Sequence, residues 1–168
     1  EKGIDTLAAA ARTLNSEGLA DKFDIAVYGT VVDGFQNEFE RLLSDVPNMT
    51  YKGAFDAATG DVCAELNMYD AAVSSSSWRE GMSGSNIECK FAGVANIVSD
   101  AGFNPECVGN GVDGLIVRPR NVGSLVEAMR SVIEDRGLLA RLKRNSYEDR
   151  VNYDVATWKR EVLDVVCG

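Results

Sequence analysis

Short apolar runs alternate along this chain with segments whose apolar residues recur at helical spacing. The apolar runs favour buried strands at 23–28, 49–52, 71–74, 95–98 and 115–117. The helical spacing predicts helices at 4–14, 35–46, 62–68, 85–92, 122–135, 137–150 and 154–166. Strands that alternate with helices form right-handed βαβ units, in which the strands are parallel. The sequence therefore predicts an α/β fold, a Rossmann-like doubly wound parallel sheet flanked by helices.

The length and composition fit a single globular domain. The chain has 168 residues, of which 45% are hydrophobic, so we expect one domain over residues 1–168 with a sizeable core. No stretch approaches the roughly 20 consecutive apolar residues that a membrane-spanning helix needs. The chain begins with Glu instead of Met and shows no signal peptide, so we expect it to be part of a longer protein.

Charge and residue usage exclude several classes of function. A net charge of −9 argues against binding to nucleic acid or, through a polybasic patch, to a membrane surface. The chain contains no histidine, which excludes a Ser-His-Asp triad, a histidine-based zinc site and a histidine general base within it. The cysteines are spread out without a Cys-x-x-Cys pair, so we expect reduced thiols and a cytoplasmic location.

A loop of small residues between the third predicted strand and the helix at 85–92 is the main candidate site. Glu80 and Glu88 stand eight residues apart and flank this loop. A loop of this kind that enters a helix offers free backbone N–H groups to an anion. The two carboxylates can accept hydrogen bonds from the hydroxyls of a sugar or a ribose. In doubly wound sheets ligands bind outside the carboxyl ends of the strands, and this loop belongs to that edge.

The spacing of Glu80 and Glu88 resembles the Glu-x7-Glu motif of retaining glycosyltransferases with the GT-B fold. Other segments agree in order and spacing with the donor-binding half of family 4 glycosyltransferases (glycosyl transferases group 1): Lys2–Leu7, Val27–Gly29, Tyr51–Gly53, Gly93–Val94, Ser99–Gly102, Pro105–Glu106 and Gly111–Val117. The resemblance implies the C-terminal half of a GT-B fold. It also implies the donor-binding domain of a retaining, metal-independent hexosyltransferase.

The resemblance gives roles to individual residues. Glu88 would hold the ribose hydroxyls of the donor nucleotide, Glu80 would be the catalytic residue that contacts the transferred sugar, and Lys2 would neutralise the diphosphate. The remaining donor contacts would come from Gly81, Met82, Ser83, Gly84 and Ser85 in the loop, and from Gly29, Gly53, Ala54 and Phe55 near the nucleotide base. The substrate would be a UDP- or GDP-sugar, without a cofactor. No metal is implied, because a helix N-terminus and cations can stabilise the leaving diphosphate instead.

The resemblance also implies partners outside this chain. An acceptor glycan or lipid would bind through an N-terminal domain absent from this chain, so the isolated chain should bind nucleotide and transfer little or no sugar. Peripheral membrane association of the full protein is compatible with this, whereas no nucleic-acid partner is expected. The family's first strand ends just before the Lys-Gly segment, so a chain that begins at Glu1 should lack it. The sheet then has a gap, is completed by another molecule, or belongs to a larger folded unit.

Several positions depart from the family pattern and leave other functions open. The chain has Met82-Ser83 for Phe-Gly, Cys89-Lys90 for Ala-Met, Ala95-Asn96 for an initial Pro and Phe103-Asn104 for Gly-Ile. The altered loop is compatible with a non-catalytic, Rossmann-like assembly or regulatory module that no longer binds a donor. The Glu-x7-Glu spacing disfavours a nucleotide-sugar epimerase of the same fold. A redox domain is disfavoured because no Gly-x-Gly-x-x-Gly follows the first predicted strand.

Purely structural interpretations of these residues are open as well. Glu88 could close a capping box with Ser85 at the start of its helix, and Glu80 and Lys2 could be solvated charges. Asp100 could be a turn residue or a helix cap, and Pro105 could lie in the first turn of a helix. Trp78 could be part of the core or of the site wall, and Trp158 part of the core. The run Ser74–Ser77 could be the exit of a strand.

Overall fold

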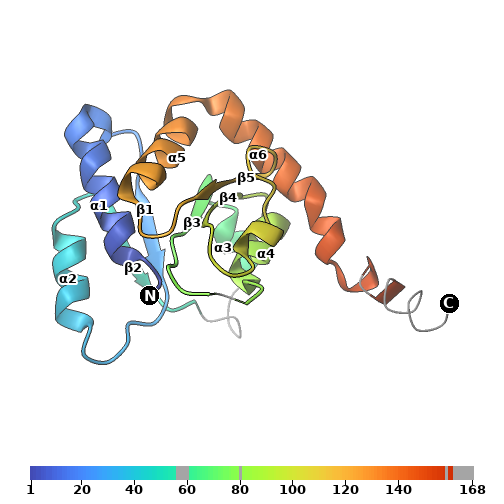
Figure 1. Ribbon diagram of the computed structural model, residues 1–168, viewed down its shortest axis with the longest axis horizontal. Helices are drawn as coiled ribbons and strands as arrows, with labels where there is room; N and C mark the ends of the chain where they lie inside the picture. The colour runs from blue at the N-terminus through green and yellow to red at the C-terminus, as the bar shows by residue number, and fades with distance from the viewer. Residues whose placement is uncertain (56–60, 80, 158, 161–168) are drawn as a thin grey trace.

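The computed structural model describes residues 1–55, 61–79, 81–157, 159 and 160, and shows helices packed around parallel strands (Figure 1). The strands are β1 (Ile25–Tyr28), β2 (Met49–Gly53), β3 (Ala71–Ser74), β4 (Ala95–Ser99) and β5 (Gly114–Val117). The α-helices are α1 (Ile4–Leu14), α2 (Gln36–Ser44), α3 (Val62–Leu66), α4 (Gly84–Phe91), α5 (Val122–Glu134) and α6 (Arg136–Asp149). Short turns of other helix types are η1 (Asn15–Leu19, π) and η2 and η3 (Asn104–Glu106 and Arg150–Tyr153, both 3₁₀).

The predicted elements are confirmed, with small shifts at their ends. All five predicted strands and the first six predicted helices are present, and their ends differ from the prediction by at most two residues. The last predicted helix, at 154–166, is helical at 155–157 and at 159–160, whereas Trp158 and residues 161–168 lie outside the described residues. β1 begins at Ile25 rather than Phe23, because the carbonyl of Phe23 accepts from the side chain of Asn48 at 2.8 Å instead of joining the strand ladder.

The described strands form two separate sheets, which agrees with a gap in the sheet, one of the alternatives expected from the sequence. β1 pairs with β2, and β3, β4 and β5 form a second sheet in that order; every pairing is parallel. Within the described part of the chain, no strand pairs with the other edge of β1 or of β3. The two sheets are joined instead by side chains, since the hydroxyl of Tyr28, at the end of β1, bonds to Glu65 of α3 and lies 2.7 Å from the hydroxyl of Tyr69.

Helices cover both faces of the strands (Figure 1). α1 and α5 pack together on one face, and α3 and α4 pack against the other. Successive residues of β3 alternate between these layers, with Ala71 and Val73 in the larger cluster and Ala72 in the smaller one, as the pleat of a strand requires. The larger cluster contains some of the most deeply buried side chains of the molecule: Ala8, Ala11, Leu14, Ile97, Leu125 and Leu142. This two-sided covering confirms the α/β fold class.

No helix in the described ranges has both the length and the hydropathy to cross a bilayer.

Candidate functional site

The N-terminal segment is fixed beside the end of β3 by the serine run. The hydroxyl of Ser75 donates to the carbonyl of Gly3 at 2.8 Å, and that of Ser76 donates to the carbonyl of Glu1 at 3.2 Å. The backbone N–H of Ser77 also donates to Glu1, at 2.9 Å. These bonds place Lys2, which is exposed, where the chain leaves β3 toward the Glu80 loop. The serine run is thus more than the strand exit that the sequence suggested.

Gly3 is required by this close approach of two backbones. Its φ of 77° lies in the left-handed region, where side chains other than glycine are strained. A Cβ atom at this position would overlap the carbonyl oxygen of Ser75 and would lie 2.7 Å from its carbonyl carbon and 2.8 Å from its hydroxyl oxygen. The Lys-Gly pair therefore brings Lys2 to the carboxyl edge of β3.

The first turn of α4 opens toward the same edge. Ser83 is the N-cap residue, and its side chain makes no capping hydrogen bond with the helix. Its hydroxyl lies instead 2.9 Å from that of Ser85. The capping-box interpretation of Glu88 is wrong, because α4 begins at Gly84 and Glu88 lies beyond its first turn. No described side chain caps this first turn, so its amide dipoles face the loop.

Glu88 is exposed and lies near the thiols of α3 and α4. Burial raises the pKa of Cys89 to about 12, and the negative charge of Glu88 adds to this shift. The pKa of Cys63 is also raised, first by its burial and then by the charges of Asp61 and Glu88. The exposed carboxylate of Glu88 is therefore close enough to Cys63 of α3 and Cys89 of α4 to raise the pKa of both thiols.

The ends of β1 and β2 meet at Gly29 and Gly53. The backbone N–H of Gly29 donates to the carbonyl of Gly53 at 3.0 Å, and the Tyr51 hydroxyl donates to the carbonyl of Gly29 at 2.7 Å. Both glycines have positive φ, 133° and 85°, which lets the chain turn directly after each strand. Ala54 is exposed and Phe55 half-buried just beyond.

The structure brings the predicted site residues together in two groups at the carboxyl edge. Lys2 lies with the β3 exit, and Gly29 lies with Gly53. Gly81, Met82 and Ser83 lead directly into α4, whose first two residues are Gly84 and Ser85, and Met82 is 65% exposed. Glu80, the predicted catalytic residue, lies outside the described residues.

A buried network of asparagines connects α4 to β4 and η2 and was not predicted from the sequence. The side chain of Asn86 accepts from the Ser74 hydroxyl at 2.7 Å and donates to the side chain of Asn104 at 3.1 Å. The side chain of Asn96 donates to the backbone carbonyl of Asn86 at 3.1 Å. The three asparagines are each 1% exposed. Asn96 and Asn104 are two of the departures from the family pattern, which is the signal that could have revealed the network.

The simpler structural interpretations have different outcomes. Asp100 is an exposed bend residue whose N–H donates to Val117, and Pro105 lies in the first turn of η2, as predicted. Trp78 is 61% exposed and therefore not part of the core. The thiols of Cys63, Cys89 and Cys107 are free, as expected.

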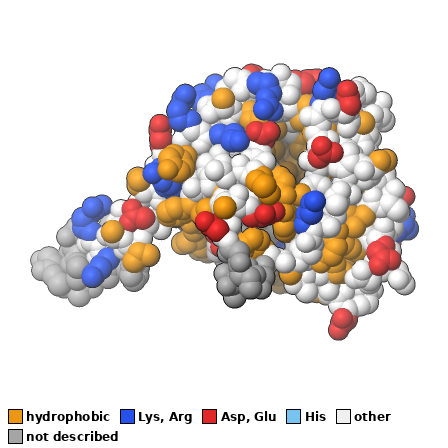
Figure 2. Space-filling view, turned by 180° about the vertical axis from the view of Figure 1, so that it is seen from behind, with side chains coloured by type: hydrophobic (Ala, Val, Ile, Leu, Met, Phe, Trp, Pro, Cys, Tyr) orange, Lys and Arg blue, Asp and Glu red, His pale blue; other side chains and the backbone are white. Residues whose placement is uncertain are grey.

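The surface shows no single-sign charge patch on the face in Figure 2, where acidic and basic side chains are interspersed and apolar ones surround a hollow. One open hollow of about 520 Å³ lies between α3, α4 and α6, and another of about 640 Å³ lies beside η2 and the end of α6. Neither is lined by the predicted donor residues. A site on the edge of one domain is open on one side, since many ligand sites are completed only at a domain interface.

The family match covers most of the chain. The family described as "Glycosyl transferases group 1" matches residues 1–149 of this chain. The chain belongs to this family. A group 1 relative among curated proteins is the N,N'-diacetylbacillosaminyl-diphospho-undecaprenol alpha-1,3-N-acetylgalactosaminyltransferase of Campylobacter jejuni. It is 35% identical over 78 residues, which are 46% of this chain and 21% of that protein.

Solved structures resemble the group 1 domain over nearly its whole length. A protein of Anabaena in complex with UDP superposes with a TM-score of 0.81 at 20% identity, covering 99% of this chain and 45% of that one. The C-terminal domain of a glycosyl transferase group 1 family protein from Francisella tularensis has a TM-score of 0.79 at 20% identity, covering 92% and 80%. The likeness shows the fold, that of the C-terminal half of GT-B enzymes. The chain spans about a fifth of the curated relative and less than half of the Anabaena protein.

Proposed function

We propose that this chain is the donor-binding domain of a retaining, metal-independent glycosyltransferase of family 4. The intact enzyme would transfer a hexose from a UDP- or GDP-sugar to a carbohydrate or lipid-linked acceptor held by a separate N-terminal domain. Family membership supports the transferase activity. The undecaprenol-linked substrate in the relative's name supports a lipid-linked acceptor, and the UDP in the Anabaena structure supports a nucleotide donor.

The observation that carries the proposal is the uncapped first turn of α4 at the carboxyl edge. The N-terminus of a helix carries about half a positive charge and offers N–H groups, and no described side chain caps those of α4. The serine run holds the segment that contains Lys2 at the exit of β3, from which the loop to α4 departs. A cation and a helix dipole at one edge fit a diphosphate.

The chemistry of transfer explains why such an arrangement is useful. When the glycosidic bond to the donor breaks, the nucleoside diphosphate leaves with additional negative charge. Dipoles and cations fixed in advance around that charge lower the barrier without reorganising. In this proposal Lys2 and the amides of Met82 to Ser85 bind the diphosphate, Glu88 accepts from the ribose hydroxyls, and Glu80 contacts the transferred sugar.

Calorimetric titration with UDP, GDP and ADP in the presence of EDTA tests the proposal. We expect one nucleotide to bind without metal, and the Glu88→Ala variant to bind it about tenfold or more weakly, because two hydrogen bonds to a charged acceptor are lost. Glu127→Ala is a matched control, since Glu127 is an exposed carboxylate on α5. It should bind like the original chain.

The outcomes separate the two candidate functions. Binding that is lost in Glu88→Ala and retained in Glu127→Ala supports the donor site and identifies the base. A folded chain that binds none of the three nucleotides contradicts it and favours the non-catalytic module, in which the Met82-Ser83 loop no longer holds a donor. A nucleotide that binds only when a divalent metal is added contradicts metal independence.

A further inference from the structure

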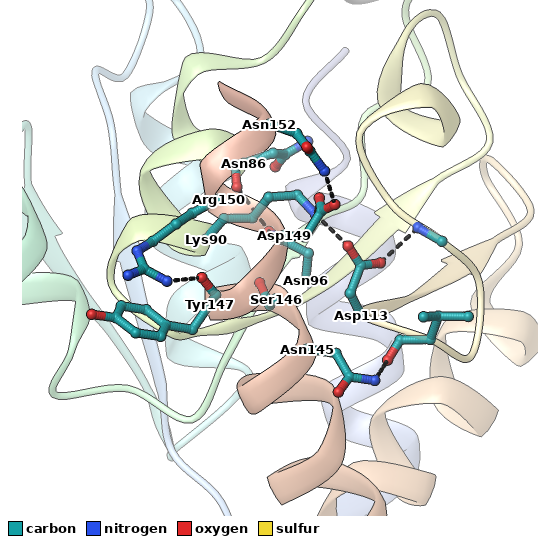
Figure 3. A network of polar contacts seen from close by, with 12 residues as sticks. Asn86, Lys90, Asn96, Asp113, Asn145, Ser146, Tyr147, Asp149, Arg150 and Asn152 are labelled. Atoms are coloured by element: carbon teal, nitrogen blue, oxygen red, sulfur yellow. Dashed lines mark hydrogen bonds and ion pairs between the residues drawn. The ribbon is translucent and has the colours of Figure 1, made fainter. Parts of the chain in front are cut away.

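One buried cation joins the helix that carries Glu88 to two distant parts of the chain. Lys90 lies on the inner face of α4, and its side chain is 0% exposed. Its ammonium donates to Asp113, and to Asp149 at 2.8 Å (Figure 3). Asp113 lies in the turn before β5, and Asp149 ends α6. We call these three residues the Lys90 clamp.

Each carboxylate of the clamp is fixed by a second bond. The other oxygen of Asp113 accepts from the backbone N–H of Gly109 at 2.6 Å, and the other oxygen of Asp149 accepts from Asn152 at 2.7 Å (Figure 3). The clamp is therefore anchored in the turn before β5 and in η3. On the Asp113 side the supporting bond comes from the backbone, and on the Asp149 side it comes from an exposed side chain.

The end of α6 is tied to its neighbours by further bonds. The Asn145 side chain donates to the carbonyl of Val112 at 2.8 Å, and the Ser146 hydroxyl donates to the carbonyl of Val94 at 3.0 Å. α6 thus holds the turn before β5 and the start of β4 in place. Lys90 is the link from this assembly to α4.

We propose that Lys90 is a positioning residue for the donor site, which clamps α4 so that Glu88 and the loop amides keep the geometry that binds a nucleotide. This inference rests on the donor role proposed above. Lys90 lies two residues from Glu88 on the same helix, and a rotation or shift of α4 moves both. A site whose supporting contacts are loose loses affinity even when all its direct contacts are retained.

The electrostatics keep the clamp closed over the physiological range. The ammonium of Lys90 faces Asp113, Asp149, the ring of Tyr153 at 5.5 Å and the thiol of Cys107. Burial alone would lower the pKa of Lys90, but its hydrogen bonds with the two carboxylates outweigh this and raise it. A raised pKa of a cation means that its stabilising effect is complete below its unfolded-state pKa and is lost only as pH rises through the folded-state value. The clamp should therefore be insensitive to pH between 5.5 and 8.

Lys90→Met, which places the family's usual residue at this position, is the test. Without the ammonium, Asp113 and Asp149 lose the cation that pairs with both of them, and α4 loses its attachment to the turn before β5 and to the end of α6. We expect the variant to bind nucleotide about fivefold or more weakly than the original chain at pH 8.

Lys143→Met is the matched control. Lys143 of α6 is partly exposed and pairs with Asp70 at 3.1 Å, so its loss removes an ion pair in which no residue of α4 takes part. The proposal is overturned if a folded Lys90→Met variant binds nucleotide at pH 8 with an affinity within twofold of the original chain. It is also overturned if Lys143→Met loses as much nucleotide affinity as Lys90→Met does. If Lys90→Met does not fold, Asp149→Ala takes its place, because it removes the half-exposed carboxylate of the clamp. This variant should weaken nucleotide binding, though less than expected for Lys90→Met. Unchanged nucleotide affinity in Asp149→Ala overturns the proposal.

Hydrogen exchange separates failure of the clamp from failure of the donor assignment. An original chain that binds no nucleotide contradicts the donor role alone. The clamp is then tested by the hydrogen exchange of the backbone amides of residues 84–87. These should exchange faster in Lys90→Met than in the original chain, whereas the amides of β4 should exchange at the same rate. Asp149→Ala replaces Lys90→Met if that variant does not fold. Equal changes in both elements indicate only a loss of global stability and overturn the positioning role.

Discussion

At Gly3 the backbone leaves no room for a side chain, and the position of Lys2 depends on this close approach. Gly3→Ala must either clash with Ser75 or break the bonds that hold the N-terminal segment. We expect a loss of about 2–4 kcal/mol in the free energy of unfolding, from left-handed strain and steric overlap together. Urea denaturation measures it. Gly18→Ala is the control, because Gly18 has a similar φ of 85° and no atom within 4 Å of an added Cβ. It should cost only about 1 kcal/mol, and equal losses in both variants would contradict the close approach.

The thiols of α3 and α4 should differ in reactivity. Cys89 is 3% exposed and its pKa is raised to about 12, so at pH 8 almost none of it is thiolate. Cys63 is half-buried, and its pKa is raised less. We expect iodoacetamide to alkylate Cys63 first in the folded chain and Cys89 only on unfolding, as followed by mass spectrometry.

The raised pKa also means that the contribution of Cys89 to stability is present below about pH 9 and declines as pH rises toward 12. Equal alkylation rates would contradict the buried position of Cys89.

At the scale of elements, α4 is attached to the strands by polar groups at its first and last turns. Asn86→Leu would leave the hydroxyl of Ser74 and the side chain of Asn104 without their partners in the interior. We expect a loss of about 2–4 kcal/mol in unfolding free energy, since each buried group without a partner costs roughly 1–3 kcal/mol. Asn37→Leu, on the exposed surface of α2, should change stability by no more than about 0.5 kcal/mol.

The three asparagines should also behave as one unit. The triple variant Asn86→Leu/Asn96→Val/Asn104→Ile removes the network together with two buried amide atoms that have no hydrogen-bond partner among the described residues, one each on Asn96 and Asn104. We expect its loss in unfolding free energy to be smaller than the summed losses of the three single variants by more than about 1 kcal/mol. The reason is that the energetic effects of substitutions at neighbouring polar groups are not additive. Additive urea-denaturation energies would contradict the coupling.

At the scale of the whole molecule, a nucleotide that binds only the folded chain must raise its melting temperature. At a ligand concentration of about one hundred times Kd the stabilisation is about 2.7 kcal/mol. For a chain of this size that corresponds to a rise of roughly 5–10 °C. Scanning calorimetry measures this shift, which should shrink in Glu88→Ala at the same nucleotide concentration. An identical shift with inorganic phosphate would show that only the anion is recognised.

The sequence predicted the elements well and their assembly less well. The alternation of apolar runs and helical spacing predicted all five strands, because parallel strands covered by helices form short apolar runs, as in β1. The sequence left open whether the sheet has a gap, and the structure shows β1–β2 and β3–β5 as separate sheets, because pairing depends on which strand edges meet and no local pattern encodes that. The Glu80 loop was identified from spacing and resemblance. The tie from Lys2 and Gly3 to the serine run was not, since it joins residues more than seventy positions apart.

The sequence by itself determined the family, the α/β class and the positions of the candidate donor residues, because these depend on short-range periodicity and on motifs in a fixed order. Only the tertiary structure decided how the departures from the family pattern are accommodated. Asn96 and Asn104 meet Asn86, and Lys90 meets Asp113 and Asp149, so polar residues at positions that are usually apolar find their partners within the fold. The physical reason is that a buried polar or charged group is tolerated only when it is paired, and its partners come from segments far away in the sequence.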